Sequence, residues 1–289
     1  MPEKSSEKIT IHTLAEKKAR GEKITCLTTY DYPSAQLAER AGIDVALVGD
    51  SASMVVAGRP NTLEATLEEM IYHTRAARRG IERALLVADM PFGSYQVSES
   101  EAVRNALRLV KEAGAEAVKL EGGRKQAPLV ERLVQSEIPV MGHIGLTPQS
   151  IHLLGGYRVQ GKSIAAGRAL LDDARALAAA GAFSIVLEGI PREIAAWITR
   201  EAPIPTIGIG AGPDCDGQVL VWHDLLGLSL ETRPKFVRRY ANLAGEIETA
   251  LRRFIQDVQS GAFPSEAESY HLPATEQEKL LLAQSHAAR

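Results

Sequence analysis

Four carboxylates stand just after short runs of aliphatic residues: Asp50, Asp89, Glu121 and Glu188. A single acid in such a place is typically a helix cap or a turn residue. Four of them brought together would repel one another unless a cation lay among them or some were protonated. Carboxylates and water suit Mg²⁺ or Mn²⁺, whereas zinc requires closely spaced His or Cys. If these segments converge, the set predicts a hard divalent cation held by Asp50 and Asp89.

Other residues that could take part in chemistry occupy similar positions. Lys119 alternates with Glu121 in an apolar run, so both side chains point to the same face of a strand. Two interpretations of Lys119 stay open: a buried salt bridge with Glu121, or a partner for a substrate carboxylate or oxyanion. His143 is either a structural histidine at a strand end or a polar contact to substrate. Tyr30 and Ser51 also follow apolar runs.

The apolar runs predict strands that are buried on both faces, as in parallel sheets, because the runs are continuous rather than alternating. Seven are clear and an eighth is weaker: 24–29, 45–48, 85–88, 117–120, 138–141, 184–187, 206–209 and, weaker, 219–222. Helical patterns separate them, with Thr66–Glu69 and Ser98–Glu101 as expected capping boxes. Alternating strands and helices indicate an α/β fold.

A weak internal repeat favours closure of the sheet. AGIDVALVGD, AGAEAVKLEG and AGAFSIVLEG each run from Ala-Gly through a strand to a carboxylate. About eight repeated units predict a (βα)₈ barrel, although an open doubly wound sheet is an alternative. In a barrel the carboxyl ends of the strands meet at one mouth, so the polar residues above are expected to converge there. An amphipathic segment at 10–20 precedes the first strand and can plug the barrel bottom.

Composition narrows the possible partners. The 289 residues include 33 Lys and Arg against 36 Asp and Glu, a formal charge of −3, which argues against nucleic acid as a partner. No apolar run approaches the ~20 residues of a membrane helix, and the first residues do not resemble a secretory signal. Two cysteines give neither a disulfide framework nor a zinc motif. We therefore expect a cytoplasmic enzyme without membrane contact, with one catalytic domain over 1–264 and a polar tail over 265–289.

The glycine-rich stretch IGIGAG at 207–212 is a weak candidate for a phosphate loop. Asp214-Cys215-Asp216 follow it where a helix should begin. A tight turn at the barrel mouth or an anion-binding nest is the better interpretation.

Several blocks together resemble one family. LVGDSASMV, EEMIYHT, VADMPFGSY, VKLEGG, MGHIGLTPQS, GGYRVQGK, VLEG and IGIGAGPDCDGQVLVWHDLLGL occur in a single order within residues 8–272. They are similar to ketopantoate hydroxymethyltransferases, which transfer a hydroxymethyl group from 5,10-methylenetetrahydrofolate to 3-methyl-2-oxobutanoate in pantothenate biosynthesis. Pro60-Asn61-Thr62 departs from the family pattern, in a loop expected near the mouth.

The resemblance implies a (βα)₈ barrel of the phosphoenolpyruvate/pyruvate superfamily and a role for each candidate residue. By resemblance, Asp50, Asp89 and Glu121 are expected to bind one Mg²⁺ per subunit, Glu121 directly or through its waters. Glu188 is expected to be the catalytic base, and folate a co-substrate. The substrate-binding residues implied are Asp50, Ser51, Asp89, Lys119, Tyr30 and His143. The family also implies a homo-oligomer, a decamer built as a pentamer of dimers.

Two other functions fit parts of the pattern. A lyase or mutase of the same superfamily would share the Mg²⁺ and the enolate, but its Lys-Lys-Cys-Gly-His type motif is missing from this sequence. A non-catalytic 2-oxo-acid sensor would use the same fold, although binding alone needs no base such as Glu188.

Overall fold

The computed structural model describes residues 7–230 and 234–287 and contains a closed, eight-stranded parallel barrel. The strands pair in chain order, and β8 returns to β1. Their bounds are β1 Ile24–Thr28, β2 Val45–Val48, β3 Leu85–Asp89, β4 Ala117–Glu121, β5 Val140–Gly145, β6 Ser184–Glu188, β7 Thr206–Ile209 and β8 Gly217–Leu220. The barrel prediction is confirmed, and the open sheet is excluded.

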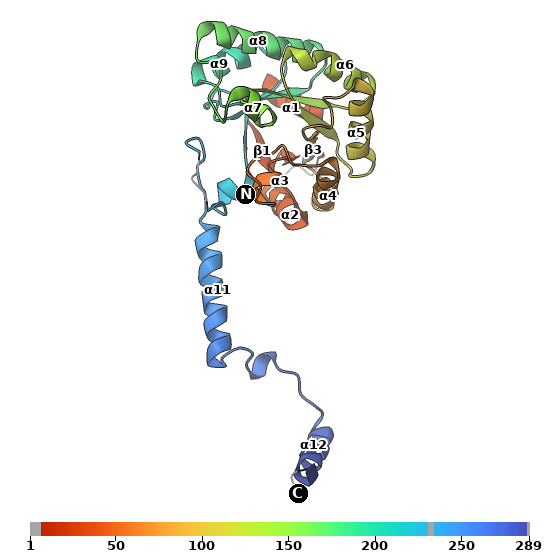
Figure 1. Cartoon of the computed structure of the whole chain (residues 1–289), viewed down its shortest axis with the longest axis vertical. Helices are drawn as coiled ribbons and strands as arrows, with labels where there is room; N and C mark the ends of the chain where they lie inside the picture. The colour runs from red at the N-terminus through yellow and green to blue at the C-terminus, as the bar shows by residue number, and fades with distance from the viewer. Residues whose placement is uncertain (1–6, 231–233, 288–289) are drawn as a thin grey trace. The chain divides into compact units, whose positions relative to one another are not determined.

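Helices precede, separate and follow the strands, although β7 and β8 are joined without one (Figure 1). They are α1 Ile11–Ala19, α2 Tyr32–Ala41, α3 Ala52–Val55, α4 Leu67–Arg78, α5 Glu99–Lys111, α6 Ala127–Gln135, α7 Ile151–Leu154, α8 Ile164–Ala179, α9 Arg192–Glu201, α10 Trp222–Leu226, α11 Leu243–Ser260 and α12 Ala274–Ala287, with 3₁₀ turns η1 Arg124–Gln126, η2 Pro148–Ser150 and η3 Glu266–Glu268. None of these described helices is both long and apolar enough to cross a membrane.

Local sequence explains where the helices begin. Thr66 forms the predicted capping box with Glu69 at the start of α4. At α5 only half of the predicted box is present: the Ser98 hydroxyl accepts from the Glu101 N–H. Asp31 caps α2 with a full capping box, because its side chain accepts from the Ser34 N–H and the Ser34 hydroxyl accepts from the Asp31 N–H.

Two strand predictions need correction. The fifth strand is β5, Val140–Gly145, rather than 138–141, because Ile138 packs in the core before the ladder begins. The eighth is β8, Gly217–Leu220, rather than 219–222, and Trp222 starts α10 instead. Both changes follow from pairing with neighbouring strands, which residue type alone does not reveal.

The barrel interior is apolar at one end and polar at the other. Val45 and Leu47 of β2 pack inward with Leu14 of α1, while Ala46 and Val48 pack outward against α4. Helix α1 is tied to the amino ends of the strands by ion pairs, Lys17–Asp44 at 2.7 Å and Lys18–Asp216 at 2.7 Å. The expectation that this segment plugs the barrel bottom is thus confirmed.

The chain divides into two compact units, residues 1–241 and residues 242–289. The first contains the barrel, and the second contains α11, η3 and α12. The predicted end of the catalytic domain at residue 264 stays a prediction.

Candidate active site

The first pair of predicted ligands lies where β2 and β3 end. Asp89 is the last residue of β3, and Asp50 follows β2 by two residues. The backbone N–H of Asp50 donates to Asp89 Oδ2 at 3.0 Å, so the two acids are in contact. Gly49 permits this turn, because a Cβ there would come within 2.6 Å of Ser51 Oγ. The structure confirms that Asp50, Ser51 and Asp89 lie close together, as predicted.

Lys119 pairs with Asp89, not with Glu121. Its Nζ lies 2.8 Å from Asp89 Oδ1, since strand pairing puts Lys119 directly beside Asp89. The salt bridge with Glu121 that the sequence suggested is therefore replaced by one across the strands. Burial alone would lower the pKa of Lys119, but Asp89, Glu121 and Asp50 outweigh it and raise that pKa. Lys119 is a buried cation among acids.

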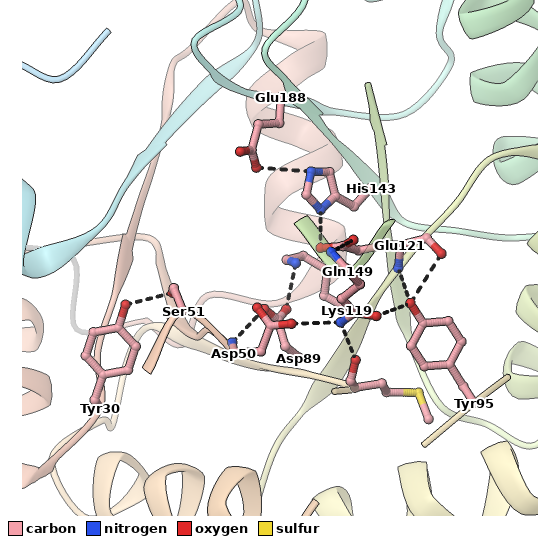
Figure 2. Close-up of polar contacts among 11 residues, drawn as sticks. Tyr30, Asp50, Ser51, Asp89, Tyr95, Lys119, Glu121, His143, Gln149 and Glu188 are labelled. Atoms are coloured by element: carbon pink, nitrogen blue, oxygen red, sulfur yellow. Dashed lines mark hydrogen bonds and ion pairs between the residues drawn. The ribbon is translucent and has the colours of Figure 1, made fainter. Parts of the chain in front are cut away.

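His143 lies between the two remaining acids (Figure 2). Its Nδ1 is 3.4 Å from Glu121 Oε1 and its Nε2 is 3.2 Å from Glu188 Oε2. These are charge contacts, because neither ring nitrogen makes a well-aligned hydrogen bond among the described residues. Burial and Lys119 lower the pKa of His143, yet the two glutamates raise it to about 9 overall. The histidine belongs to the middle of β5 rather than to a strand end.

Tyr30 and Ser51 form the edge of the same site. Their hydroxyl groups are 2.9 Å apart, and the Tyr30 ring is buried. Burial raises the pKa of Tyr30, which keeps this phenol protonated. The backbone carbonyl of Tyr30 is 2.7 Å from His73 Nδ1, and the ring packs against His223. His73, on α4, thus helps to hold Tyr30 in place.

Sequence reasoning missed two residues of this cluster, Gln149 and Tyr95. Gln149 Nε2 donates to Asp50 Oδ2 at 2.8 Å, and its backbone N–H donates to Glu121 Oε2 at 2.9 Å. The Tyr95 hydroxyl donates to Gln149 Oε1 at 2.5 Å. Neither residue titrates near neutral pH, and neither follows an apolar run. The only sequence signal for Gln149 was its place in the block MGHIGLTPQS, which the family shares.

The glycine-rich stretch at 207–212 begins inside β7, which ends at Ile209, and continues as a loop. Gly210 and Gly212 adopt left-handed backbone angles, with φ of 62° and 81°. Gln218 Nε2 donates a hydrogen bond to the Gly212 carbonyl at 2.9 Å, which holds this loop against β8. The segment is a tight turn, in line with the preferred interpretation.

The electrostatics of the cluster suit a small divalent cation. Burial first, and then Asp89 and Glu121, raise the pKa of Asp50 well above its ordinary value. A bound cation would offset the repulsion between these buried carboxylates, and carboxylate oxygens are the ligands that Mg²⁺ prefers. In the described part of the chain, no three His, Cys, Asp or Glu side chains converge closely enough to form a complete cage. Mg²⁺ commonly binds through only one or two carboxylates and fills its remaining positions with water and substrate.

Comparison with known proteins gives the family. The sequence pattern of the ketopantoate hydroxymethyltransferase family matches residues 8–266. The chain is 56% identical over 284 residues to a 3-methyl-2-oxobutanoate hydroxymethyltransferase of Koribacter versatilis, covering 98% of this chain and 96% of that protein. It is also 56% identical over 264 residues to the enzyme of that name from Pelobacter propionicus, covering 91% and 98%.

Solved structures show the same fold at low identity. A phosphonopyruvate hydrolase in complex with oxalate and Mg²⁺ superposes with a TM-score of 0.58 at 14% identity, covering 96% of each chain. A 2,3-dimethylmalate lyase of the PEP mutase/isocitrate lyase superfamily gives 0.56 at 17% identity, covering 95% of this chain and 98% of that one. These likenesses establish the barrel type, and the close relatives establish more: the chain belongs to the ketopantoate hydroxymethyltransferase family.

Proposed function

We propose that this chain transfers a hydroxymethyl group from 5,10-methylenetetrahydrofolate to 3-methyl-2-oxobutanoate, giving 2-dehydropantoate and tetrahydrofolate for pantothenate biosynthesis. Water supplies the oxygen of the new hydroxyl group. The family membership and the names of the 56% identical relatives support the substrate and the reaction. The site geometry supports a mechanism through deprotonation at C3.

The observation that carries the mechanism is the separation of the acids around the barrel mouth. Strands β2 and β6 are four apart in the closed eight-stranded order, so Asp50 and Glu188 come from opposite sides. In Figure 2, Glu188 lies beyond His143 from the Asp50–Asp89 pair. An oxo acid between them would meet two acids on one side and a separate carboxylate on the other.

The Asp50–Asp89 side is where we propose that Mg²⁺ binds, with Glu121 directly or through waters. A bound Mg²⁺ would act as a Lewis acid, polarising the keto group and stabilising the enolate. Lys119 contributes a buried positive charge that favours the substrate carboxylate or the oxyanion. Tyr30 and Ser51 present neutral hydroxyl groups that can bind the oxo acid.

On the other side we propose Glu188 as the general base. Its side chain is 16% exposed, so it is partly accessible from the mouth, and His143 contacts one of its oxygens. The C3–H bond breaks, the proton moves to Glu188, and the electron pair forms the enolate. The enolate carbon then bonds to the iminium methylene carbon of the folate, and the C=N π pair moves to the folate nitrogen. Water then replaces that nitrogen on the methylene carbon, which breaks the C–N bond, releases tetrahydrofolate and leaves the new hydroxyl group. A positioned base supplies about 10²–10⁴-fold of rate.

Proton NMR of 3-methyl-2-oxobutanoate in D₂O tests this function. We expect the purified protein with Mg²⁺ to exchange the C3 proton, and a metal chelator to stop it. Added methylenetetrahydrofolate should then yield 2-dehydropantoate. Exchange without any product would favour another enolate-forming enzyme of the superfamily, and binding without exchange would favour a 2-oxo-acid sensor.

A further inference from the structure

Gln149 is a neutral side chain buried among charged ones. It lies in the 3₁₀ turn η2 that follows β5, and it is 6% exposed. Around it are the carboxylates of Asp50 and Glu121, which come from the segments at the ends of β2 and β4. Gln149, in the loop after β5, thus contacts the acid that follows β2 and the acid that ends β4.

Its amide has one orientation only. Nε2 donates to Asp50 Oδ2 at 2.8 Å and to the Met90 carbonyl at 3.0 Å. The Met90 carbonyl can only accept, so the NH₂ group must face it and Oε1 must point away. Oε1 accepts from the Tyr95 hydroxyl at 2.5 Å. That hydroxyl in turn accepts from the backbone N–H of Glu121 at 3.2 Å.

The network fixes one oxygen of each carboxylate and leaves the other available. Asp50 Oδ2 takes the side-chain amide, while Oδ1 receives no hydrogen bond from the residues that the structure describes. Glu121 Oε2 takes the Gln149 backbone N–H at 2.9 Å. Its Oε1 has only the charge contact with His143 at 3.4 Å. One residue therefore sets the rotation of both acids (Figure 2).

An uncharged donor has a particular advantage here. The acids of this cluster already have Lys119 as a buried cation partner. A second lysine or an arginine in place of Gln149 would compete with a divalent cation for the same oxygens. An amide satisfies Asp50 without adding charge, so the site keeps its attraction for a cation.

We propose that Gln149 is a positioning residue for the metal site, and that Tyr95 holds its amide in register. Gln149 orients Asp50 so that its Oδ1 is free to bind the cation, and it holds Glu121, whose Oε1 also contacts His143. The inference rests on the proposed function, because it concerns the same Mg²⁺. It adds two residues, Gln149 and Tyr95, to those that the sequence singled out.

Divalent-cation affinity measured without substrate tests the proposal. Isothermal titration of Mg²⁺ and Mn²⁺ would compare the full-length protein with Gln149→Leu and Tyr95→Phe, at a temperature where each is folded by circular dichroism. We expect Gln149→Leu to weaken binding by about 10–100-fold, as loss of an outer partner of a metal ligand does. Tyr95→Phe keeps the Gln149 amide but removes the hydrogen bond that holds its Oε1, and should weaken cation binding by roughly 2–10-fold.

Leu133→Ala serves as the control for a merely structural effect. Leu133 of α6 is fully buried in the core between helices and strands, so its truncation lowers the melting temperature without touching the acids. Its cation affinity should equal that of the unmodified protein. If a folded Gln149→Leu or Tyr95→Phe variant binds the cation as tightly as the unmodified protein, the positioning role is wrong, while the proposed function still stands. No binding by the unmodified protein would overturn the Mg²⁺-dependent function as well.

Discussion

Lys119 shows how its neighbours determine the state of a buried charge. The side chain is 7% exposed, and its ammonium group contacts Asp89 at 2.8 Å. Burial disfavours the charged form, but three nearby acids raise the pKa of Lys119 and keep it protonated. It is therefore suited to bind an anion and unsuited to act as a base, whereas the proposed mechanism assigns proton abstraction to Glu188.

Glu188→Gln tests that division of roles. The amide keeps the shape of the side chain but cannot accept the C3 proton, so exchange should fall by about 10²–10⁴-fold. Binding of Mg²⁺ and of the oxo acid should remain, since neither involves Glu188 in the proposed mechanism. Proton NMR in D₂O measures the exchange, and calorimetry measures the binding. Glu193→Gln, on the exposed face of α9, is the matched control; full exchange in Glu188→Gln would remove Glu188 from the base role.

Asp50→Asn tests the metal site itself. Replacing this carboxylate removes a charge and a donor oxygen, and should weaken Mg²⁺ binding by more than the ~10–100-fold of an outer partner. Asp44→Asn is the matched control, because Asp44 is a buried acid at the other end of β2 that pairs with Lys17 at 2.7 Å. The measurement is a Mg²⁺ titration of both variants. Equal affinity in the two would argue against Asp50 as a ligand.

The sequence predicted the titrating residues of the site but not their partners. Asp89, Glu121 and Glu188 could be recognised as site candidates because each is an acid just after an apolar run. The Lys119–Asp89 pair depends on the register between β3 and β4, which residue order does not encode. Gln149 could not be found because a neutral amide on a loop is ordinary until its contacts are known.

The strands explain why so many polar side chains face inward. Along each strand, alternate residues enter the barrel, so Lys119 and Glu121 share the inward face with Ala117 below them. Asp89 and Glu188 likewise end β3 and β6, one residue beyond the predicted segments. The apolar pattern stops at the first polar residue, whereas the backbone hydrogen bonds of a strand continue through it.

Helix α4 offers a test of stability against pH. Arg59 forms a two-pronged ion pair with Glu69, at 2.6 and 2.9 Å, and the Thr66 N–H also donates to that carboxylate. Arg59 first, and then Thr66, lower the pKa of Glu69 to about 2. A lowered pKa stabilises the fold above the ordinary value near 4.5, and this stabilisation is lost as pH falls toward 2.

The comparison for this test is between the unmodified protein and Glu69→Gln. At pH 6 we expect Glu69→Gln to lower the free energy of unfolding by up to about 1 kcal/mol, because the pair is partly exposed. The difference should shrink between pH 4.5 and 2, as followed by urea unfolding. Glu64→Gln is the control, since Glu64 reaches the same arginine only at 3.8 Å. A difference that does not change with pH would contradict this account of Glu69.

Along the whole chain, the end of the catalytic domain is the boundary still to be tested. Residues 242–289 form a compact unit of their own, although the sequence predicts a domain that extends to residue 264. Helix α11 carries apolar side chains that recur along one face. They are Ile247, Leu251, Phe254, Ile255 and Val258, each about half exposed. An amphipathic helix of this kind normally buries such a face.

Two truncated chains decide where the domain ends. A chain of residues 1–264 should keep C3 proton exchange and melt within about 2–4 °C of the full-length protein, because the removed tail is mostly polar and its residues 265–286 are exposed. We predict that the apolar face of α11 stabilises the catalytic domain, so a chain of residues 1–241, which lacks α11, should melt lower, since burying one apolar side chain contributes up to about 1.5–3 kcal/mol. Equal melting of both chains with the full-length protein would place the boundary at 241. A low melting temperature for residues 1–264 would make the tail part of the stable enzyme.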